Sequence, residues 1–137
     1  MYPALGKVYT MAMKIVIGQA NGTTIQKELD DAAAKPLLGK KVGDIVKGEA
    51  IGLTGYEFKI MGGSDNCGFP MRVDVPGNAR KQILAVEGVG LHRTAHGIKH
   101  RKTVCGQIVS PRIVQLNVKV VKEGAEKLVA PPKVEKK

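Results

Sequence analysis

The residues best suited to chemistry gather between Glu87 and Glu123, an interval that contains no acidic residue. It holds seven lysines and arginines and all three histidines of the chain. Lysine and arginine neutralise phosphates and release their counterions, and arginine can also stack on a base. Neutral histidine can donate a hydrogen bond to a phosphate or a 2′-hydroxyl. The basic loop from His92 to Lys102 therefore predicts an RNA contact, and its alternative is a solvated basic loop without a fixed partner.

Metal binding and catalysis are weaker interpretations of the same loop. His92, His96 and His100 are spaced four apart, so on a helix they would line one face and could bind zinc. However, Gly97 interrupts this segment, its flanks are cationic, and no carboxylate is near to orient a metal-bound imidazole. The chain also lacks a nucleophile elbow and a Cys/His pair at a characteristic spacing. We expect no enzyme activity, no cofactor and no metal site.

A second informative stretch, from Ile60 to Arg72, has the sequence IMGGSDNCGFPMR. We expect a strand to end at Gly62-Gly63, because a polar turn and further turn-forming residues follow. Glycine can take a positive φ, and Phe69 and Met71 are suited to anchoring the loop on a core. The alternative, a glycine-rich phosphate cradle, does not fit, since neither GxxxxGK[ST] nor GxGxxG is present. The stretch therefore predicts a structural loop beside an RNA face.

Composition supports a polyanionic partner. Lysine and arginine number 22 against 12 acidic residues, which gives a formal charge of +10 over 137 residues. No apolar run approaches the roughly 20 residues of a spanning helix, so we expect no membrane partner. Cys67 and Cys105 stand far apart without a CxxC pair, and Met1 to Ala12 does not resemble a secretory signal. We interpret both cysteines as buried or half-buried reduced thiols in a cytoplasmic protein.

The elements that must position these residues are predicted to be short strands. Alternating or continuous apolar residues predict strands over 14–19, 23–29, 56–61, 82–86, 103–109 and 113–121. Asn21-Gly22 fits a hairpin turn, and Pro36 limits any helix within Asp31–Leu38 to a turn or two. This pattern predicts a mainly β fold, a small closed or partly open barrel of short strands with long basic loops. We expect an N-terminal extension over 1–12, the RNA-binding domain over 13–124 and a basic solvated tail over 125–137.

The glycine-rich stretch resembles the signature of small-subunit ribosomal protein six, in the form shared by archaea and eukaryotes. The pattern Gly-Gly-x-Asp-x-x-Gly-x-Pro-Met is filled at Gly62, Gly63, Asp65, Gly68, Pro70 and Met71. A second set of matching residues follows in the family's order, and the resemblance covers roughly 13–124. This set comprises Gly88, Arg93, Thr94, Gly97, Arg101, Lys102, Val104, Gly106, Ile108, Val109, Leu116, Asn117, Val120 and Lys122.

Two departures from the eukaryotic members are visible. The basic loop has fewer arginines and uses His96, Ile98 and His100 among its basic residues. The long basic C-terminal helix with phosphorylated serines is absent, so the resemblance is to the short archaeal form and implies no regulation by phosphorylation.

The resemblance implies a structural constituent of the small ribosomal subunit that binds ribosomal RNA and supports translation in the cytoplasm. The implied partners are ribosomal RNA and neighbouring ribosomal proteins, without a membrane or a small-molecule substrate. The alternative is a transiently bound translation factor or RNA chaperone. The RNA-binding candidates are the cations and histidines of the basic loop and of the segments near the glycine-rich stretch: Lys40, Lys41, Arg72, Arg80, Lys81, His92, Arg93, His96, Lys99, His100, Arg101, Lys102 and Arg112.

Overall fold

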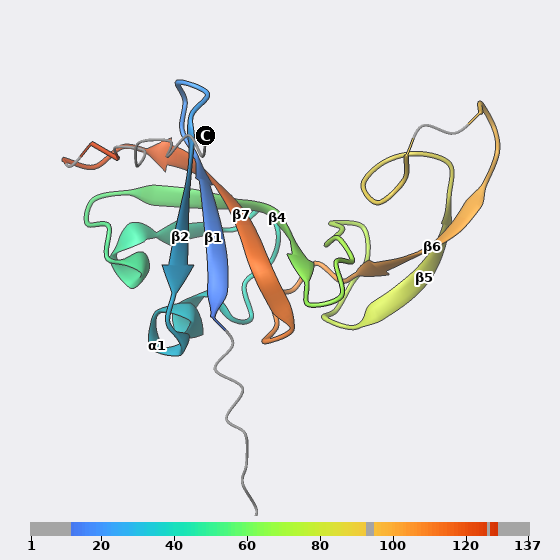
Figure 1. The fold of residues 1–137 in the computed structure, drawn as a ribbon, viewed down its shortest axis with the longest axis horizontal. Helices are drawn as coiled ribbons and strands as arrows, with labels where there is room; N and C mark the ends of the chain where they lie inside the picture. Colours follow the sequence, from blue (N-terminus) through green and yellow to red (C-terminus); the bar gives the residue numbers. More distant parts are fainter. Residues whose placement is uncertain (1–11, 93–94, 126, 129–137) are drawn as a thin grey trace, which may run out of the picture.

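The computed structural model describes residues 12–92, 95–125 and 127–128. The protein, within these residues, consists of two parts. The first, here called the body, is a five-stranded sheet with short helical turns (Figure 1). The second, here called the arm, comprises residues 80–105 and contains a two-stranded sheet that extends away from the body (Figure 1). The mainly β prediction is confirmed. No helix in the described ranges is long and apolar enough to cross a membrane.

The body sheet has the order β2-β1-β7-β4-β3. Only the β1–β7 pair is parallel, and the other three pairs are antiparallel. The sheet is open in the described part of the chain, with β2 and β3 at its edges, so closure into a barrel is not confirmed. The strands are β1 (Met13–Gly18), β2 (Thr24–Leu29), β3 (Ile45–Lys47), β4 (Glu57–Asp65) and β7 (Ile113–Lys122).

Alternation along the strands builds the core on one face of the sheet. Ile15 in β1, Phe58 and Ile60 in β4, and Leu116 in β7 are fully buried, while their chain neighbours face outward. The helical turns α1 (Asp31–Ala34), η1 (Lys35–Leu37) and η2 (Gly48–Ile51) add apolar side chains to this core. Helix α1 is as short as predicted, because Pro36 lies in the first turn of η1 and cannot continue the α-helical hydrogen bonds.

The arm pairs β5 (Arg80–Ala85) with β6 (His100–Cys105) antiparallel, from Arg80↔Cys105 at its base to Ala85↔His100. Strand β6 was expected to start at residue 103 and to reach residue 109, and this prediction is wrong at both ends. The ladder with β5 includes His100, Arg101 and Lys102, so the last three of the eleven residues of the predicted basic loop belong to a strand. Alternating hydrophobicity could not reveal this, since both faces of the arm are largely solvated near its tip.

The prediction that a strand ends at Gly62-Gly63 is also wrong, because β4 continues to Asp65. The ladder with β7 shifts register between Ile60 and Gly62 and then resumes. At Gly63 a Cβ atom would lie 2.4 Å from the carbonyl oxygen of Gln115, so only glycine lets the two backbones stay paired. The glycines therefore extend the strand instead of ending it.

Two further expectations need correction. Cys105 is buried, but Cys67 is exposed, because it lies at the tip of the polar turn that follows β4. In the expected solvated tail, Leu128 packs against the core, and its carbonyl oxygen accepts a hydrogen bond of 2.9 Å from Gln19 Nε2. The structure of the expected N-terminal extension, except Ala12, and of residues 129–137 lies outside the described residues.

Candidate RNA interface

The glycine-rich motif forms a turn around one buried carboxylate, that of Asp65 at the end of β4. One of its oxygens, Oδ1, accepts hydrogen bonds from the backbone amides of Cys67 (2.8 Å) and Phe69 (3.0 Å). Its other oxygen, Oδ2, accepts from Arg80 Nε and from the Cys105 thiol (3.2 Å). The side chain of Asp65 has no exposed surface, so these four donors replace its water.

Arg80 and Cys105 are the first residue of β5 and the last of β6, so the Asp65 carboxylate joins the body to the base of the arm. The guanidinium of Arg80 also donates to Asn66 Oδ1 (2.8 Å) and lies 5.3 Å from the ring centroid of Phe69. Arg80 is therefore held by three partners inside the protein.

Charge and burial oppose each other in this network. Burial alone would raise the pKa of Asp65, but the hydrogen bonds from Cys105, Arg80 and the amides of Phe69 and Cys67 hold that pKa below its ordinary value. Burial, together with the neighbouring Asp65 carboxylate, raises the pKa of the Cys105 thiol to about 11. At neutral pH the pair is thus an ionised Asp65 carboxylate that accepts a hydrogen bond from the protonated Cys105 thiol.

The remaining motif residues fix the return of the chain. Gly68 has a φ of 84°, which favours glycine, and its amide donates to the carbonyl oxygen of Asp65. The carbonyl oxygen of Pro70 accepts from the Cys105 amide (2.8 Å), and the Met71 amide donates to Gly63 (2.9 Å). Met71 is buried in the core. All of these interactions are internal to the protein, and they set where the arm leaves the body.

Four cations project from the arm: Lys81, Lys99, Arg101 and Lys102 are all exposed. In the β5–β6 register Lys81 and Lys102 lie on one face, opposite Val104 and Ile83, while Arg101 lies on the other face, opposite Leu84. Within the described ranges none of these cations forms a salt bridge. Both faces of the arm therefore present cations to a partner.

Two of the residues predicted to bind RNA have partners inside the protein. Arg72 donates two hydrogen bonds to the carboxylate of Asp74 (2.9 and 2.8 Å) and one to the carbonyl oxygen of Val89 (2.8 Å), with a side chain only 13% exposed. It thereby ties the loop that follows β5 to the segment that precedes the arm. Arg80 is held by Asp65 as described. The sequence carried one signal of the first pairing, since Asp74 lies two residues after Arg72.

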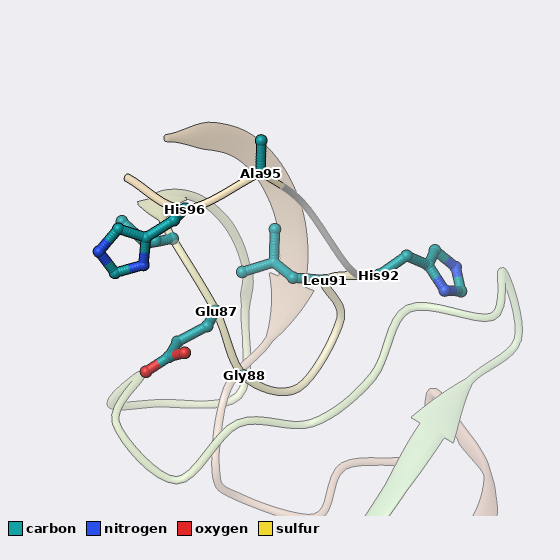
Figure 2. A pocket seen from close by; sticks show the side chains of 7 residues that line it. Glu87, Gly88, Leu91, His92, Ala95 and His96 are labelled. Carbon is teal, nitrogen blue, oxygen red and sulfur yellow. The ribbon is translucent and has the colours of Figure 1, made fainter. Parts of the chain in front are cut away.

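The histidines of the loop lie apart. Figure 2 shows the pocket near the arm tip, where the rings of His92 and His96 point in opposite directions, with Leu91 between them. The described residues of this segment, 92 and 95–100, are not helical, and Gly97 takes a φ of 81° in a turn. His100 belongs to β6. No three potential metal ligands come together in the part of the chain that the structure describes.

The other candidates occupy the body, apart from Arg93, which lies outside the described residues together with Thr94. Lys40 and Lys41 are exposed in the turn before β3, where the Lys41 amide donates to the Asp44 carboxylate (2.9 Å). Arg112 is exposed just before β7. The structure thus divides the predicted RNA-binding residues between two places.

Comparison with known proteins identifies the motif. The family model described as "Ribosomal protein S6e" matches residues 13–131. The chain belongs to this family. A relative from Archaeoglobus fulgidus is 42% identical over 116 residues, which cover 83% of this chain and 90% of the relative. Another from Methanothermobacter thermautotrophicus is 42% identical over 118 residues, covering 86% and 93%. Both are named "Small ribosomal subunit protein eS6", so the resemblance inferred from the motif is confirmed.

Proposed function

We propose that this S6e-family protein is a structural constituent of the small ribosomal subunit that binds ribosomal RNA and so supports translation. It acts by binding and not by catalysis. Its partners are ribosomal RNA and neighbouring ribosomal proteins, and its location is the ribosome in the cytoplasm. The alternative, a factor that binds the ribosome transiently, differs in how firmly the chain is held.

The observation that carries the proposal is the contrast between the junction of the arm with the body and the outer part of the arm. Arg72 is neutralised by Asp74, and Arg80 by Asp65. In the described ranges, no salt bridge is formed by the exposed cations of the arm, which are Lys81, Lys99, Arg101 and Lys102. Unneutralised cations on a projecting element suit the phosphate backbone, which is recognised by charge and shape and not by base sequence.

Exposed apolar side chains on the arm point the same way. Leu84, Val89 and Ile98 are 60%, 57% and 49% exposed, respectively. Contiguous exposed apolar patches often mark sites that a partner covers. We propose that the arm inserts among RNA segments and neighbouring proteins, which would cover these side chains.

For the body we propose a partly open barrel. Backbone hydrogen bonds connect residues 39–42 to residues 107–109, including Gly39 to Val109 (2.9 Å) and Val42 to Gln107 (3.0 Å). These hydrogen bonds extend the backbone pairing beyond the five strands and support a sheet that curves around the core.

The direct test is a salt series of binding to a small-subunit RNA fragment. Replacing Arg93, Lys99, Arg101 and Lys102 with alanine should flatten the dependence of log affinity on log salt by up to about 3 units, at roughly 0.7–0.9 for each lost phosphate contact. The variant should still fold, because Lys99, Arg101 and Lys102 lie outside the core. A control variant, Lys35→Ala with Lys127→Ala, removes two exposed cations of the body. An unchanged slope in the quadruple variant would move the RNA contact to Lys40, Lys41 and Lys81.

Sedimentation separates the two forms of binding. A structural constituent should stay with small subunits washed in high salt, whereas a transient factor should be released. Release of the wild-type chain at the salt concentration that retains other ribosomal proteins would favour the alternative.

A further inference from the structure

The outer face of the body sheet carries a charge arrangement that the arm does not explain. Because side chains alternate along a strand, the face opposite the core holds Lys14 of β1, Lys59 of β4, and Gln115, Asn117 and Lys119 of β7. All five are exposed.

The strand register places two lysines directly opposite each other at the centre of this face. Lys59 pairs with Lys119 across β4 and β7, and the same row continues to Gly18 on one side and Ile45 on the other. Directly opposed residues have Cβ atoms about 4.5–5.5 Å apart, and like charges in this position destabilise a sheet. Neither lysine forms a salt bridge within the described ranges.

The same face also carries a cross-strand pair of opposite charge. Lys14 and Glu28 are also direct cross-strand partners, and they form an ion pair of 3.3 Å. In contrast, Lys59 and Lys119 carry like charges that repel each other across the two strands. An anion shared by the two lysines would relieve this repulsion.

The row of residues beside the Lys59–Lys119 pair includes a glycine and has hydrogen-bonding side chains next to it. Asn117 pairs with Gly62 on β4 and with Val16 on β1, and it accepts a hydrogen bond of 3.1 Å from Gln115 Nε2. Gly62 has no positive φ, and a Cβ atom added there would meet nothing within 4 Å. Packing therefore does not require glycine at position 62, in contrast to Gly63. Without a side chain at Gly62, a partner can approach Asn117 and the lysines closely.

From these observations we infer that the outer face of the body sheet is a second RNA-binding surface. Lys59 and Lys119 bind backbone phosphate together, and the amides of Asn117 and Gln115 donate to phosphate oxygens or 2′-hydroxyls over the open position at Gly62. The inference rests on the proposed RNA-binding function and adds to it a surface distinct from the arm. RNA is preferred to an acidic protein because two adjacent lysines beside amide donors match phosphate and sugar groups.

Two variants of the full chain test this surface by RNA binding across a salt series. Lys59→Gln with Lys119→Gln should lower the salt slope by about 1.4–1.8, as for two phosphate contacts, while urea denaturation should show unchanged or higher stability. Gly62→Val should retain the fold, since the added side chain enters open space, and should weaken binding at least tenfold by blocking approach. The control variant Lys35→Gln with Lys127→Gln loses the same charge and should keep the slope.

The outcomes separate this inference from the proposed function. The arm quadruple variant is measured in parallel. If wild-type binding depends on salt and the arm variant loses slope, while both sheet variants match the control, then the second surface is overturned and the arm proposal stands. If the wild type shows no salt-dependent RNA binding, both fail. If the sheet variants keep RNA affinity and lose only a neighbouring ribosomal protein, the face binds protein and the inference is overturned.

Lysine acetylation of the complex offers an independent readout. With RNA bound, Lys59 and Lys119 should be protected from an amine-reactive reagent, while Lys35 should react as in the free protein. Equal reactivity of all three lysines in the bound and free states would overturn the inference.

Discussion

The body and the arm are stabilised by different physical means. The body buries large apolar side chains such as Phe58, Ile15 and Leu116 completely. On the two strands of the arm, only Val104 and Cys105 are buried, and both lie at its base. What fixes the arm is polar: the Asp65 carboxylate binds Arg80 and Cys105, and Arg72 binds Asp74 and Val89. The comparison teaches that one region is ordered by burial and the other by charge at its attachment point.

The largest expected effect is in the body. Phe58 is fully buried, and its ring stacks on Tyr56 with centroids 5.7 Å apart. Phe58→Ala should lower the free energy of unfolding by about 3–5 kcal/mol through lost burial and a cavity. Urea denaturation measures this change. Val73→Ala, at a residue 63% exposed, should change stability by less than about 0.5 kcal/mol, and equal losses in both variants would contradict the assignment of the core.

The body was largely predictable, because burial leaves a periodic trace in the sequence. Strand β7 alternates Leu116, Val118 and Val120 with polar residues, and the structure buries the first two and partly buries the third. Pro36 limited α1 for a reason that is visible locally. These features depend on near neighbours in the chain, and a single sequence contains that information.

The attachment of the arm was not predictable in the same way. Asp65 and Cys105 are 40 residues apart, and Arg80 is 15 residues from Asp65, so no local period links them. The motif was recognised from its fixed residues, but the partner of its aspartate was not. Likewise, the opposed Lys59 and Lys119 depend on a register shift between Ile60 and Gly62 that composition does not reveal.

The next effect sharpens the comparison at the junction. Asp65→Asn keeps the size of the side chain but removes the charge that Arg80 and Cys105 share. Stability should fall by about 2–3 kcal/mol, less than for a fully buried ion pair because the Arg80 side chain is 32% exposed. Hydrogen exchange should quicken more at the β5 and β6 amides than at β1 and β7.

The control for this variant is Asp74→Asn, in a pair whose carboxylate is 60% exposed, with an expected loss below about 1 kcal/mol. Uniformly faster exchange through both regions of Asp65→Asn would show that the arm and the body open as one unit.

Acid should reproduce part of the Asp65→Asn effect in the wild type. The pKa of Asp65 is lowered in the fold, so its stabilisation is present above the unfolded pKa of about 3.9 and is lost as pH falls through the folded value. The difference in unfolding free energy between wild type and Asp65→Asn should therefore be full at pH 6–7 and should shrink below about pH 4. A difference that stays constant down to pH 2 would exclude an ionised Asp65 as the source.

Alkali tests the other member of the pair. The pKa of Cys105 is raised to about 11 from 9.0, so its contribution is complete below about pH 9 and is lost as pH rises toward 11. That loss, roughly 3 kcal/mol, should be seen in urea midpoints of the wild type and should be absent in Cys105→Ala. A Cys67→Ala variant is the matched control, because Cys67 is exposed and should leave the alkaline loss unchanged.

The smallest effect concerns the C-terminal segment, where the sequence and the structure lead to different expectations. Pro131-Pro132 and the charged end predict that truncation after Gly124 leaves the thermal midpoint nearly unchanged. The structure places Leu128 against the core, with its carbonyl oxygen bonded to Gln19. Since full burial of a leucine contributes about 1.5–3 kcal/mol and Leu128 is only partly buried, truncation should cost about 1 kcal/mol. Leu128→Ala in the full chain should reproduce most of that loss, whereas Lys127→Ala should not. If the truncated chain unfolds at the wild-type temperature, the body is complete at Gly124 and the contact of Leu128 contributes nothing measurable.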